Sequence, residues 1–311
     1  MKNILSYYYN VHPDNISHKQ DDYYFNYNNN YYVFQMLKRP SSDVEFLYEL
    51  NKKMIEKNIL VHEIILNTEN NKITYINNKS FVLMIFHINP NLKISLYDIY
   101  YINNQTINLK TGDILNRFNW INLWETKNDY IESQINELGI KFPNISKYIN
   151  YYIGLAENAI SYARNILTKN EKIDLCISHK RIKFDDSLFD LYNPLNYICD
   201  YKIRDICEYV KDVFFYKDEK IAYYIVENYF KNNKITYTEA LLFYSRLLYP
   251  SYFFDLYDDI INEKKNELEI EKIIIKSNEY EHFLLNTYLF LSNLYNIYIP
   301  SIDWIIKRSY I

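Results

Sequence analysis

Glycine is the residue that most constrains this 311-residue chain, because it occurs only three times, as Gly112, Gly139 and Gly154. Rossmann and P-loop folds need clustered glycines where the backbone approaches a phosphate closely. The nucleophile elbow of α/β-hydrolases needs two glycines within one five-residue motif. The three positions lie too far apart for any of these motifs, so dinucleotide-binding, P-loop and α/β-hydrolase enzymes of standard construction are excluded.

Charge, cysteine and histidine patterns exclude further classes. The formal net charge is −4 and the basic residues are dispersed, so we expect no nucleic-acid partner. Cys176, Cys199 and Cys207 include no CxxC pair, which favours free thiols over a disulfide framework or a zinc site. The six histidines form no HExxH motif, so no metal site is expected. A hydrophobic fraction of 49% allows a large core.

No segment is apolar enough to predict a transmembrane helix. The longest apolar run covers about eight residues, from Phe81 to Ile88, against the roughly 20 needed to cross a bilayer. The N-terminal sequence MKNILSYYYN lacks the long apolar core of a signal peptide. The sequence therefore predicts a soluble, cytoplasmic protein.

The first 90 residues are predicted to form strands around one helix. Two strands flank an Asn28-Asn29-Asn30 turn, because asparagine tolerates the left-handed conformation. Ser42 and Glu45 have capping-box spacing, with Ser42 as the N-cap of an amphipathic helix that ends near Lys57. We expect a small antiparallel sheet with this helix between its second and third strands, the strands being 22–27, 31–38, 61–66, 72–76 and 80–88.

The remainder, after Pro90 and Asn91, is predicted to be largely helical, with Trp120 and Trp124 as core aromatics. A capping box at Thr236 marks one helix start. A β-branched run at 172–178 predicts one isolated strand, followed by an irregular polar stretch to about Tyr201. The expected helices are 119–138, 144–167, 204–215, 219–230, 238–248, 251–263 and about 270–298.

This order of elements is the layout of the protein-kinase-like fold. The predicted class is α+β with two lobes, a small antiparallel-sheet N-lobe with one helix at 1–90 and a large, mostly helical C-lobe at 91–311.

Four segments carry a resemblance to a known family. Residues 36–39 (MLKR) close a strand before the capped helix, and 177–179 (ISH) end the isolated strand. Residues 200–209 (DYKIRDICEY) match the pattern D-x-x-x-R-D-(L/I)-x-E-(W/Y), and 243–254 (FYSRLLYPSYFF) form an aromatic-proline segment. From about residue 20 to the end the chain resembles the CotS/YutH group of spore-coat kinase-like proteins, most of all its YutH members. That group lies in the aminoglycoside and choline phosphotransferase branch of the kinase-like fold.

The resemblance implies a degenerate catalytic-loop region at about 172–205. The HGDxxxxN motif of the branch falls on His179, Lys180, Arg181 and, at its Asn position, Asp186. Arginine at the base position cannot accept a proton at neutral pH. The magnesium-binding Asp expected later is replaced by residues 193–196 (NPLN), with Asp200 as the nearest following carboxylate. Asp205 matches a structural aspartate of the fold, and His179 a residue that holds the loop.

Lys38 falls where kinase-like proteins place a phosphate-binding lysine, and Glu49 is its expected helix partner because Glu45 has a capping role. Lys38 and Glu49 are vestigial nucleotide-binding candidates. A lysine at the end of a strand is common in proteins that bind no nucleotide, so its position alone does not predict binding. Asp186 and Asp200 are weak metal candidates, and the cluster of Asp185, Asp186 and Asp190 is more typical of a solvated loop. No catalytic residue, cofactor or metal is expected.

The sequence thus favours a catalytically inactive kinase-like protein with a structural or assembly role. By resemblance it would be a spore-coat-associated protein of a low-G+C bacterium, with protein partners. Two alternatives stay open. One is an active, ATP-dependent small-molecule phosphotransferase with a hydroxyl acceptor, whose carboxylate comes from Asp185, Asp186 or Asp200. The other is a pseudokinase that binds nucleotide without using it. ATP and magnesium are cofactors only under these alternatives.

Overall fold

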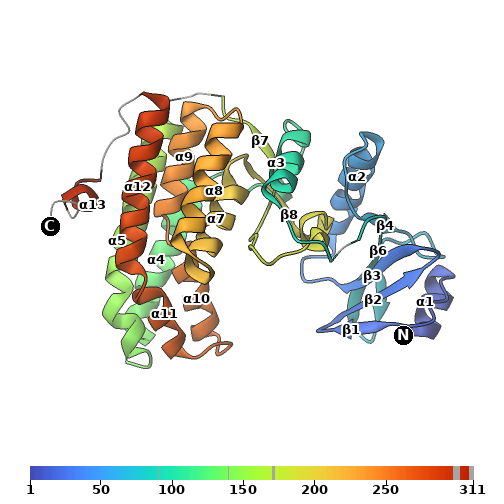
Figure 1. The fold of residues 1–311 in the computed structure, drawn as a ribbon. Coiled ribbons are helices and arrows are strands. Elements are labelled where there is room, and N and C mark those ends of the chain that lie inside the picture. Colours follow the sequence, from blue (N-terminus) through green and yellow to red (C-terminus); the bar gives the residue numbers. More distant parts are fainter. Residues whose placement is uncertain (90, 139, 170–171, 297–301, 308–311) are drawn as a thin grey trace. The chain divides into compact units, whose positions relative to one another are not determined.

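The computed structural model describes residues 1–89, 91–138, 140–169, 172–296 and 302–307, which fall into two compact units (Figure 1). Unit 1 comprises Met1–Asn116, Ile177–Lys180 and Asp185–Cys199. Unit 2 comprises Arg117–Cys176, Arg181–Phe184 and Asp200–Ile311. The chain alternates between the units, and its division into lobes at residue 90 remains a prediction of the sequence.

Unit 1 contains the predicted antiparallel sheet, extended by an edge strand, Ser17–Lys19, that was not predicted. Five strands pair in the order β1-β2-β3-β6-β4, and β5 pairs with β6. Every pairing is antiparallel. The strands are β1 (Ser17–Lys19), β2 (Asp22–Tyr27), β3 (Asn30–Met36), β4 (Glu63–Ile65), β5 (Thr74–Ile76) and β6 (Lys79–Phe86).

One face of this sheet packs against an N-terminal helix, α1 (Lys2–Tyr9), which the sequence analysis did not predict. Leu5 and Tyr9, four residues apart on α1, join Phe25, Phe34 and Leu83 of the sheet in one buried cluster. The Tyr9 hydroxyl lies 2.8 Å from the Thr74 hydroxyl, which ties α1 to β5. The helix ends at Asn10, which adopts the left-handed conformation with φ 53° and donates from its N–H to Ser6 O at 3.1 Å.

Helix α2 (Ser42–Glu56) follows β3 as predicted, but its N-terminus differs from the prediction. The N-cap is Ser41 and no side chain caps the helix, so the predicted capping box with Ser42 as N-cap is wrong. Asp43 instead accepts a hydrogen bond from Arg39 Nε at 2.9 Å, and Glu45 pairs with Lys72 at 2.6 Å. Asp43 N and Val44 N donate instead to the carbonyls of Pro40 at 3.0 Å and Ser41 at 3.2 Å.

Asparagine performs the turn-forming role that glycine has in most proteins. Among the described residues eleven non-glycine residues have positive φ, and nine of them are asparagine: Asn10, Asn28, Asn29, Asn58, Asn70, Asn77, Asn78, Asn108 and Asn296. Asn28-Asn29 closes the predicted hairpin between β2 and β3, and Asn77-Asn78 closes that between β5 and β6. Positive φ at both central residues gives the turn whose twist matches paired strands.

We expect Asn78→Gly to raise stability slightly and Asn78→Ala to lower it by about 1 kcal/mol, because an alanine Cβ disfavours the left-handed region. Urea unfolding of the two variants checks this. Asn15→Ala, an exposed loop asparagine outside the positive-φ set, should change the free energy of unfolding by less than about 0.5 kcal/mol. Equal effects at both positions would contradict the conformational explanation.

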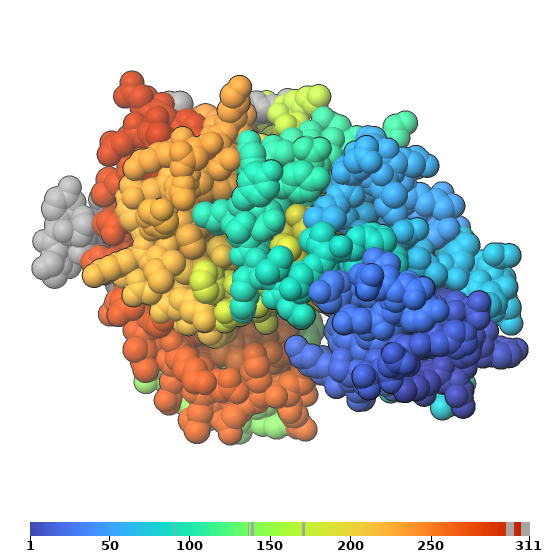
Figure 2. All heavy atoms as spheres, turned by 45° about the vertical axis from the view of Figure 1, so that its right-hand side comes forward, coloured from blue at the N-terminus to red at the C-terminus, as the bar shows by residue number. Residues whose placement is uncertain are grey.

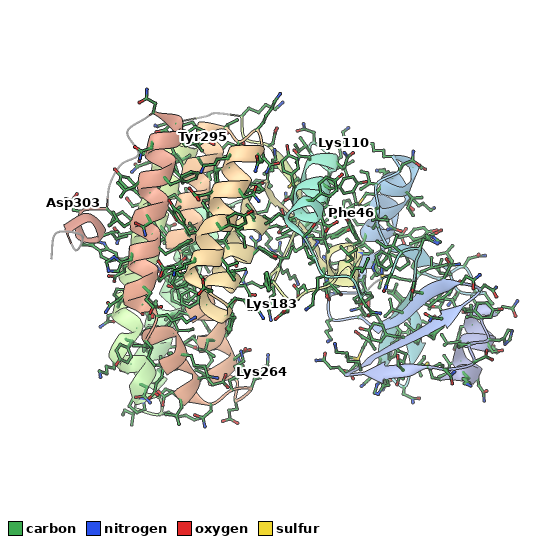
Figure 3. All side chains as sticks on the ribbon, in the orientation of Figure 1. Phe46, Lys110, Lys183, Lys264, Tyr295 and Asp303 are labelled. Carbon is green, nitrogen blue, oxygen red and sulfur yellow. The ribbon has the colours of Figure 1, made fainter. Side chains whose placement is uncertain are left out.

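Gly112 is required for packing rather than for a turn. It precedes the short helix η1 (Asp113–Leu115) with a negative φ, and a Cβ there would lie 3.0 Å from the ring of Phe46 on α2 (Figure 3). Gly154 has open space around its Cα, and Gly139 lies outside the described residues.

Unit 1 also contains α3 (Leu96–Gln105), which was not predicted, α6 (Leu188–Leu191) and η2 (Pro194–Asn196).

Unit 2 is helical, as predicted, with its long helices lying alongside one another in Figure 1. Helix α5 packs against α4 and α9, and α12 packs against α8 and α9. The predicted helix at 270–298 is divided into η3, α11 and α12, and residues 297–298 lie outside the described residues. The helices are α4 (Trp120–Leu138), α5 (Pro143–Leu167), α7 (Arg204–Tyr216), α8 (Glu219–Asn232), α9 (Tyr237–Leu248), α10 (Ser251–Ile261), η3 (Glu267–Ile270), α11 (Glu271–Ile274), α12 (Ser277–Tyr295) and α13 (Asp303–Lys307).

A two-stranded sheet completes the fold. It pairs β7 (Leu175–His179) with β8 (Tyr197–Tyr201), and the chain passes between the units within each strand. β7 was predicted, whereas β8 falls in the stretch predicted to be irregular. The predicted capping box at Thr236 is present, with the hydroxyl accepting from Glu239 N. No helix in the part of the chain that the structure describes is long and apolar enough to cross a bilayer.

Candidate functional site

His179 ends β7 and is almost completely buried, at 2% exposure. Its Nε2 lies 2.7 Å from the carbonyl oxygen of Leu191, and its ring meets Tyr197 edge-on at 5.5 Å. These contacts fix the imidazole against α6 and β8 within unit 1. The arrangement orients the loop that follows β7.

Arg181, at the position matched to the catalytic base, belongs to unit 2. Its guanidinium donates a bidentate pair of hydrogen bonds to Asp255 on α10, from Nε to Oδ2 and from Nη2 to Oδ1, the latter at 2.6 Å. Its Nε also lies 3.7 Å from Glu208. Desolvation acts to lower the pKa of Arg181, but the Glu208 and Asp255 carboxylates outweigh it and raise that pKa above its usual value. The group is a permanent cation with no capacity to accept a proton.

Asp200 lies on β8 with no exposed surface, and both of its carboxylate oxygens have partners. Oδ1 accepts from Trp120 Nε1 at 2.8 Å and from Tyr201 N at 2.7 Å, while Oδ2 pairs with Arg204. Burial raises the pKa of Asp200, and the Arg204 and Arg246 cations act to lower it. Magnesium needs oxygen ligands in an open octahedral arrangement, so these surroundings do not fit a magnesium ion.

Asp200 is one end of a larger ionic cluster inside unit 2. We define the ionic cluster as Asp200, Arg204, Glu208, Lys211 and Arg246, with Arg181 and Asp255 at its edge. Glu208 is its centre, since it accepts from Arg246 Nε at 2.9 Å and lies 3.4 Å from Lys211 Nζ. Desolvation would raise the pKa of Glu208, but Lys211, Arg246 and Arg181 hold it well below its usual value.

Aromatic rings enclose the cluster. Arg246 lies over the ring of Trp120 at 4.8 Å, and Trp120 stacks on Trp124 at 5.1 Å. Trp124 stacks in turn on Tyr249 at 4.3 Å. Both tryptophans are buried, as predicted for core aromatics. Asp205, the predicted structural aspartate, is fully buried in the first turn of α7, where the helix dipole favours a carboxylate.

The acidic residues that precede β8 have structural partners in unit 1. Asp185 pairs with Lys93 at 3.1 Å, and Asp190 forms the capping box of α6 with Ser187. The backbone carbonyl of Asp186 accepts from Ile94 N at 3.2 Å. Within the described ranges, no group of three histidine, cysteine or carboxylate side chains is arranged to hold a metal ion.

Lys38 is exposed and lies two residues beyond the end of β3. Its charge acts on Asp22. Burial raises the pKa of Asp22, while the hydrogen bond from Met36 N and the charge of Lys38 act to lower it. Glu49 is also exposed and lies 3.8 Å from Lys52, so the Lys38–Glu49 pair remains a prediction. β3 itself contains no lysine or arginine. Its Gln35 accepts from Asn193 Nδ2 at 2.8 Å.

Sequence reasoning missed Arg39, the buried cation beside Lys38. Its side chain is 7% exposed, and Nη1 donates to the carbonyls of Leu195 at 3.2 Å and Tyr197 at 3.3 Å. The i,i+4 spacing of Arg39 and Asp43 is the sequence signal that could have found the pair. The bond network ties α2 to β8 within unit 1.

Unit 1 also has an open cleft of about 770 Å³ beside β1, β2 and β3. Aromatic side chains, side-chain amides and hydroxyls form most of its lining, and residues of α6 and Asn91 complete it.

Known proteins resemble this chain in both sequence and fold. The sequence model described as "Spore coat putative kinase YutH" matches residues 2–287. The endospore coat-associated protein YutH of Bacillus subtilis is 25% identical over 175 residues, which are 51% of this chain and 51% of that protein. The match thus spans about half the length of this curated relative.

Solved structures of phosphotransferases share the fold. An aminoglycoside phosphotransferase from Alicyclobacillus acidocaldarius superposes with a TM-score of 0.61 at 9% identity, covering 93% of this chain and 95% of that one. The amicoumacin kinase hAmiN, solved in complex with AMP-PNP, Ca²⁺ and Ami, gives a TM-score of 0.55 at 11% identity, covering 92% of each chain. The predicted α+β kinase-like fold is therefore confirmed, and the extent of the family match shows that this chain belongs to the spore coat putative kinase YutH family.

Proposed function

We propose that this protein is a non-catalytic, kinase-like component with a structural or assembly role in the spore coat. The observation that carries the proposal is the pairing of Arg181 with Asp255 and Glu208. A kinase needs a carboxylate at this position to accept the proton of the attacking hydroxyl. Here a cation stands in its place and is held by two carboxylates, so this position offers no proton acceptor.

Two further parts of a phosphotransferase are altered. Kinases use carboxylate and amide oxygens to hold magnesium, and a lysine on the strand before the first helix to hold phosphate. Both carboxylate oxygens of Asp200 are occupied by Trp120, Tyr201 and Arg204, and Lys38 lies two residues beyond the end of β3 instead of on the strand. Loss of the general base alone costs on the order of a hundredfold or more in rate.

The proposal predicts that magnesium-ATP does not stabilise the protein. A ligand present at 100 times its dissociation constant would add about 2.7 kcal/mol to the free energy of unfolding. We expect no change in melting temperature at millimolar magnesium-ATP and no ADP release in a coupled assay. A functional aminoglycoside phosphotransferase serves as the positive control for both measurements.

Lys38→Ala and Lys53→Ala separate the alternatives, since both lysines are exposed and only Lys38 lies at the phosphate-lysine position. A thermal shift that Lys38→Ala removes and Lys53→Ala keeps would support a nucleotide-binding pseudokinase. Turnover of ATP would support an active phosphotransferase. Turnover overturns the non-catalytic proposal, whereas a shift without turnover overturns only the expectation that magnesium-ATP does not bind.

The spore-coat role rests on the family match and on the coat-associated relative. A fluorescent fusion made during sporulation of a Bacillus subtilis strain that lacks YutH tests it. We expect fluorescence at the surface of the forming spore. Uniform fluorescence in the mother cell would contradict the proposed location.

A further inference from the structure

The cleft of unit 1 has walls suited to a ring-shaped ligand. Tyr24 of β2, Tyr31 of β3 and Phe189 of α6 are among the side chains that line it. The Tyr24 and Phe189 rings meet edge-on at 5.5 Å, so they brace each other. The volume of about 770 Å³ falls within the usual range for small-molecule sites. In Figure 2 the dark blue surface belongs to the N-terminal residues of unit 1, which supply most of the lining.

The charges of the cleft disfavour a nucleoside triphosphate. Its lining contains two carboxylates, Asp14 and Asp190, and a single cation, Lys19. Phosphate groups are bound by clustered cations or by glycine-rich backbone. The lining contains no arginine and no glycine. A strongly anionic ligand would therefore be repelled, whereas a neutral ligand would not.

The backbone beside the cleft is also unsuited to a purine base. Asn91 N donates to Asn89 Oδ1 at 3.0 Å, and Leu92 N donates to Asn89 O at 3.4 Å. Ile94 N donates to Asp186 O, and Leu92 O accepts from Leu188 N. These groups are already bonded within unit 1, so they are not available to a base. The side chains of the lining are therefore the groups considered for recognition.

The side-chain amides are available for that purpose. Asn15, Asn26 and Asn91 line the cleft, and none of their side chains has a hydrogen-bond partner among the described residues. An amide both donates and accepts, as a sugar hydroxyl does. An aromatic face can cover the apolar C–H face of a sugar ring. We propose that this cleft binds a neutral carbohydrate, a short glucose or N-acetylglucosamine oligomer. The inference rests on the proposed non-catalytic function, because it requires a cleft that nucleotide does not occupy.

Isothermal titration calorimetry of the full chain with maltotetraose, cellotetraose and tri-N-acetylchitotriose tests the inference. We expect at least one to bind with 1:1 stoichiometry, and Tyr31→Ala to weaken that binding about tenfold, equivalent to about 1.4 kcal/mol. Asn26→Leu removes a hydrogen-bonding amide at similar size and should weaken binding as well. Tyr75→Ala removes an exposed tyrosine of β5 outside this cleft and should leave binding unchanged.

Circular dichroism shows that each variant is folded before it is titrated. Absence of binding by all three oligosaccharides at millimolar concentration overturns the inference but leaves the proposed function intact. Binding that Tyr31→Ala and Asn26→Leu do not weaken also overturns it. Magnesium-ATP binding that competes with the oligosaccharide makes the cleft a nucleotide site and overturns the inference, whereas ADP release in the coupled assay overturns the proposed function.

Discussion

Replacing Glu208 by glutamine is expected to lower the free energy of unfolding by about 3–5 kcal/mol, the usual cost of breaking a buried ion pair from one side. Glu208 is 5% exposed and is the carboxylate shared by Arg246, Lys211 and Arg181. Without its charge the buried Arg246 and Lys211 lose their carboxylate partner, whereas Arg181 keeps Asp255. The Arg246 Nη1 group already lacks a hydrogen-bond partner in the described residues, so no second acceptor there compensates for the loss of the Glu208 carboxylate.

The effect depends on pH, because these cations hold the pKa of Glu208 below its usual value. A lowered folded-state pKa contributes stability that is present above the unfolded pKa of about 4.3 and is lost as pH falls through the folded value. The difference between wild type and Glu208→Gln should therefore be full at pH 7 and should diminish below about pH 4. Urea unfolding of wild type and Glu208→Gln, at pH 7 and at a pH below about 4, measures this difference in the free energy of unfolding.

Glu263→Gln is the matched control. Glu263 pairs with Lys141 at 3.0 Å, but its side chain is 77% exposed. An exposed pair of this kind contributes about 0–1 kcal/mol. If Glu208→Gln proves as mild as Glu263→Gln, the ionic cluster does not hold unit 2 together. The explanation that Arg181 serves as a structural cation of this cluster would then be wrong as well.

Local patterns in the sequence predict most elements of this fold. The hairpin at Asn28-Asn29 and the long helices of unit 2 follow from turn chemistry and apolar periodicity. Apolar periodicity does not predict helix α3, although Ser95 and Asp98 have the spacing of the capping box that begins it. β8 was missed because its residues carry no alternation, all five being buried.

The candidate site could be predicted only in part. Alignment to a motif placed Arg181 and Asp200, and local spacing could have placed the Arg39–Asp43 pair. No local pattern indicates that Arg181 meets Asp255, 74 residues later, or that Trp120 donates to Asp200, 80 residues later. Such contacts depend on how helices pack. They decide whether a carboxylate is open to a metal or closed by an arginine.

His62 gives the second large expected effect, which is acid lability of unit 1. The ring is fully buried, stacked on Phe86 at 3.8 Å and edge-on to Phe189 at 4.8 Å. Neither ring nitrogen has a hydrogen-bond partner in the described residues. Burial lowers the pKa of His62 to about 3, so the folded protein keeps the ring neutral.

The sign follows from proton uptake. The unfolded chain protonates this histidine near pH 6.5, whereas the folded chain does so only near pH 3. Between these values the unfolded state binds more protons, so stability falls as pH falls. From pH 7 to pH 5 the loss from His62 alone should be about 2 kcal/mol. His62→Leu should remove this loss and should also be more stable at pH 7, because two unmet hydrogen-bonding groups disappear.

Urea unfolding of wild type and His62→Leu at pH 7 and pH 5 isolates the term, because other titrating groups are common to both proteins. His87→Leu is the control, since His87 is 56% exposed and lies 3.8 Å from Glu63. We expect His87→Leu to retain the wild-type loss between the two pH values. If His62→Leu retains it too, water or a local opening already lets the folded protein protonate His62. The buried, neutral state of that ring would then be wrong.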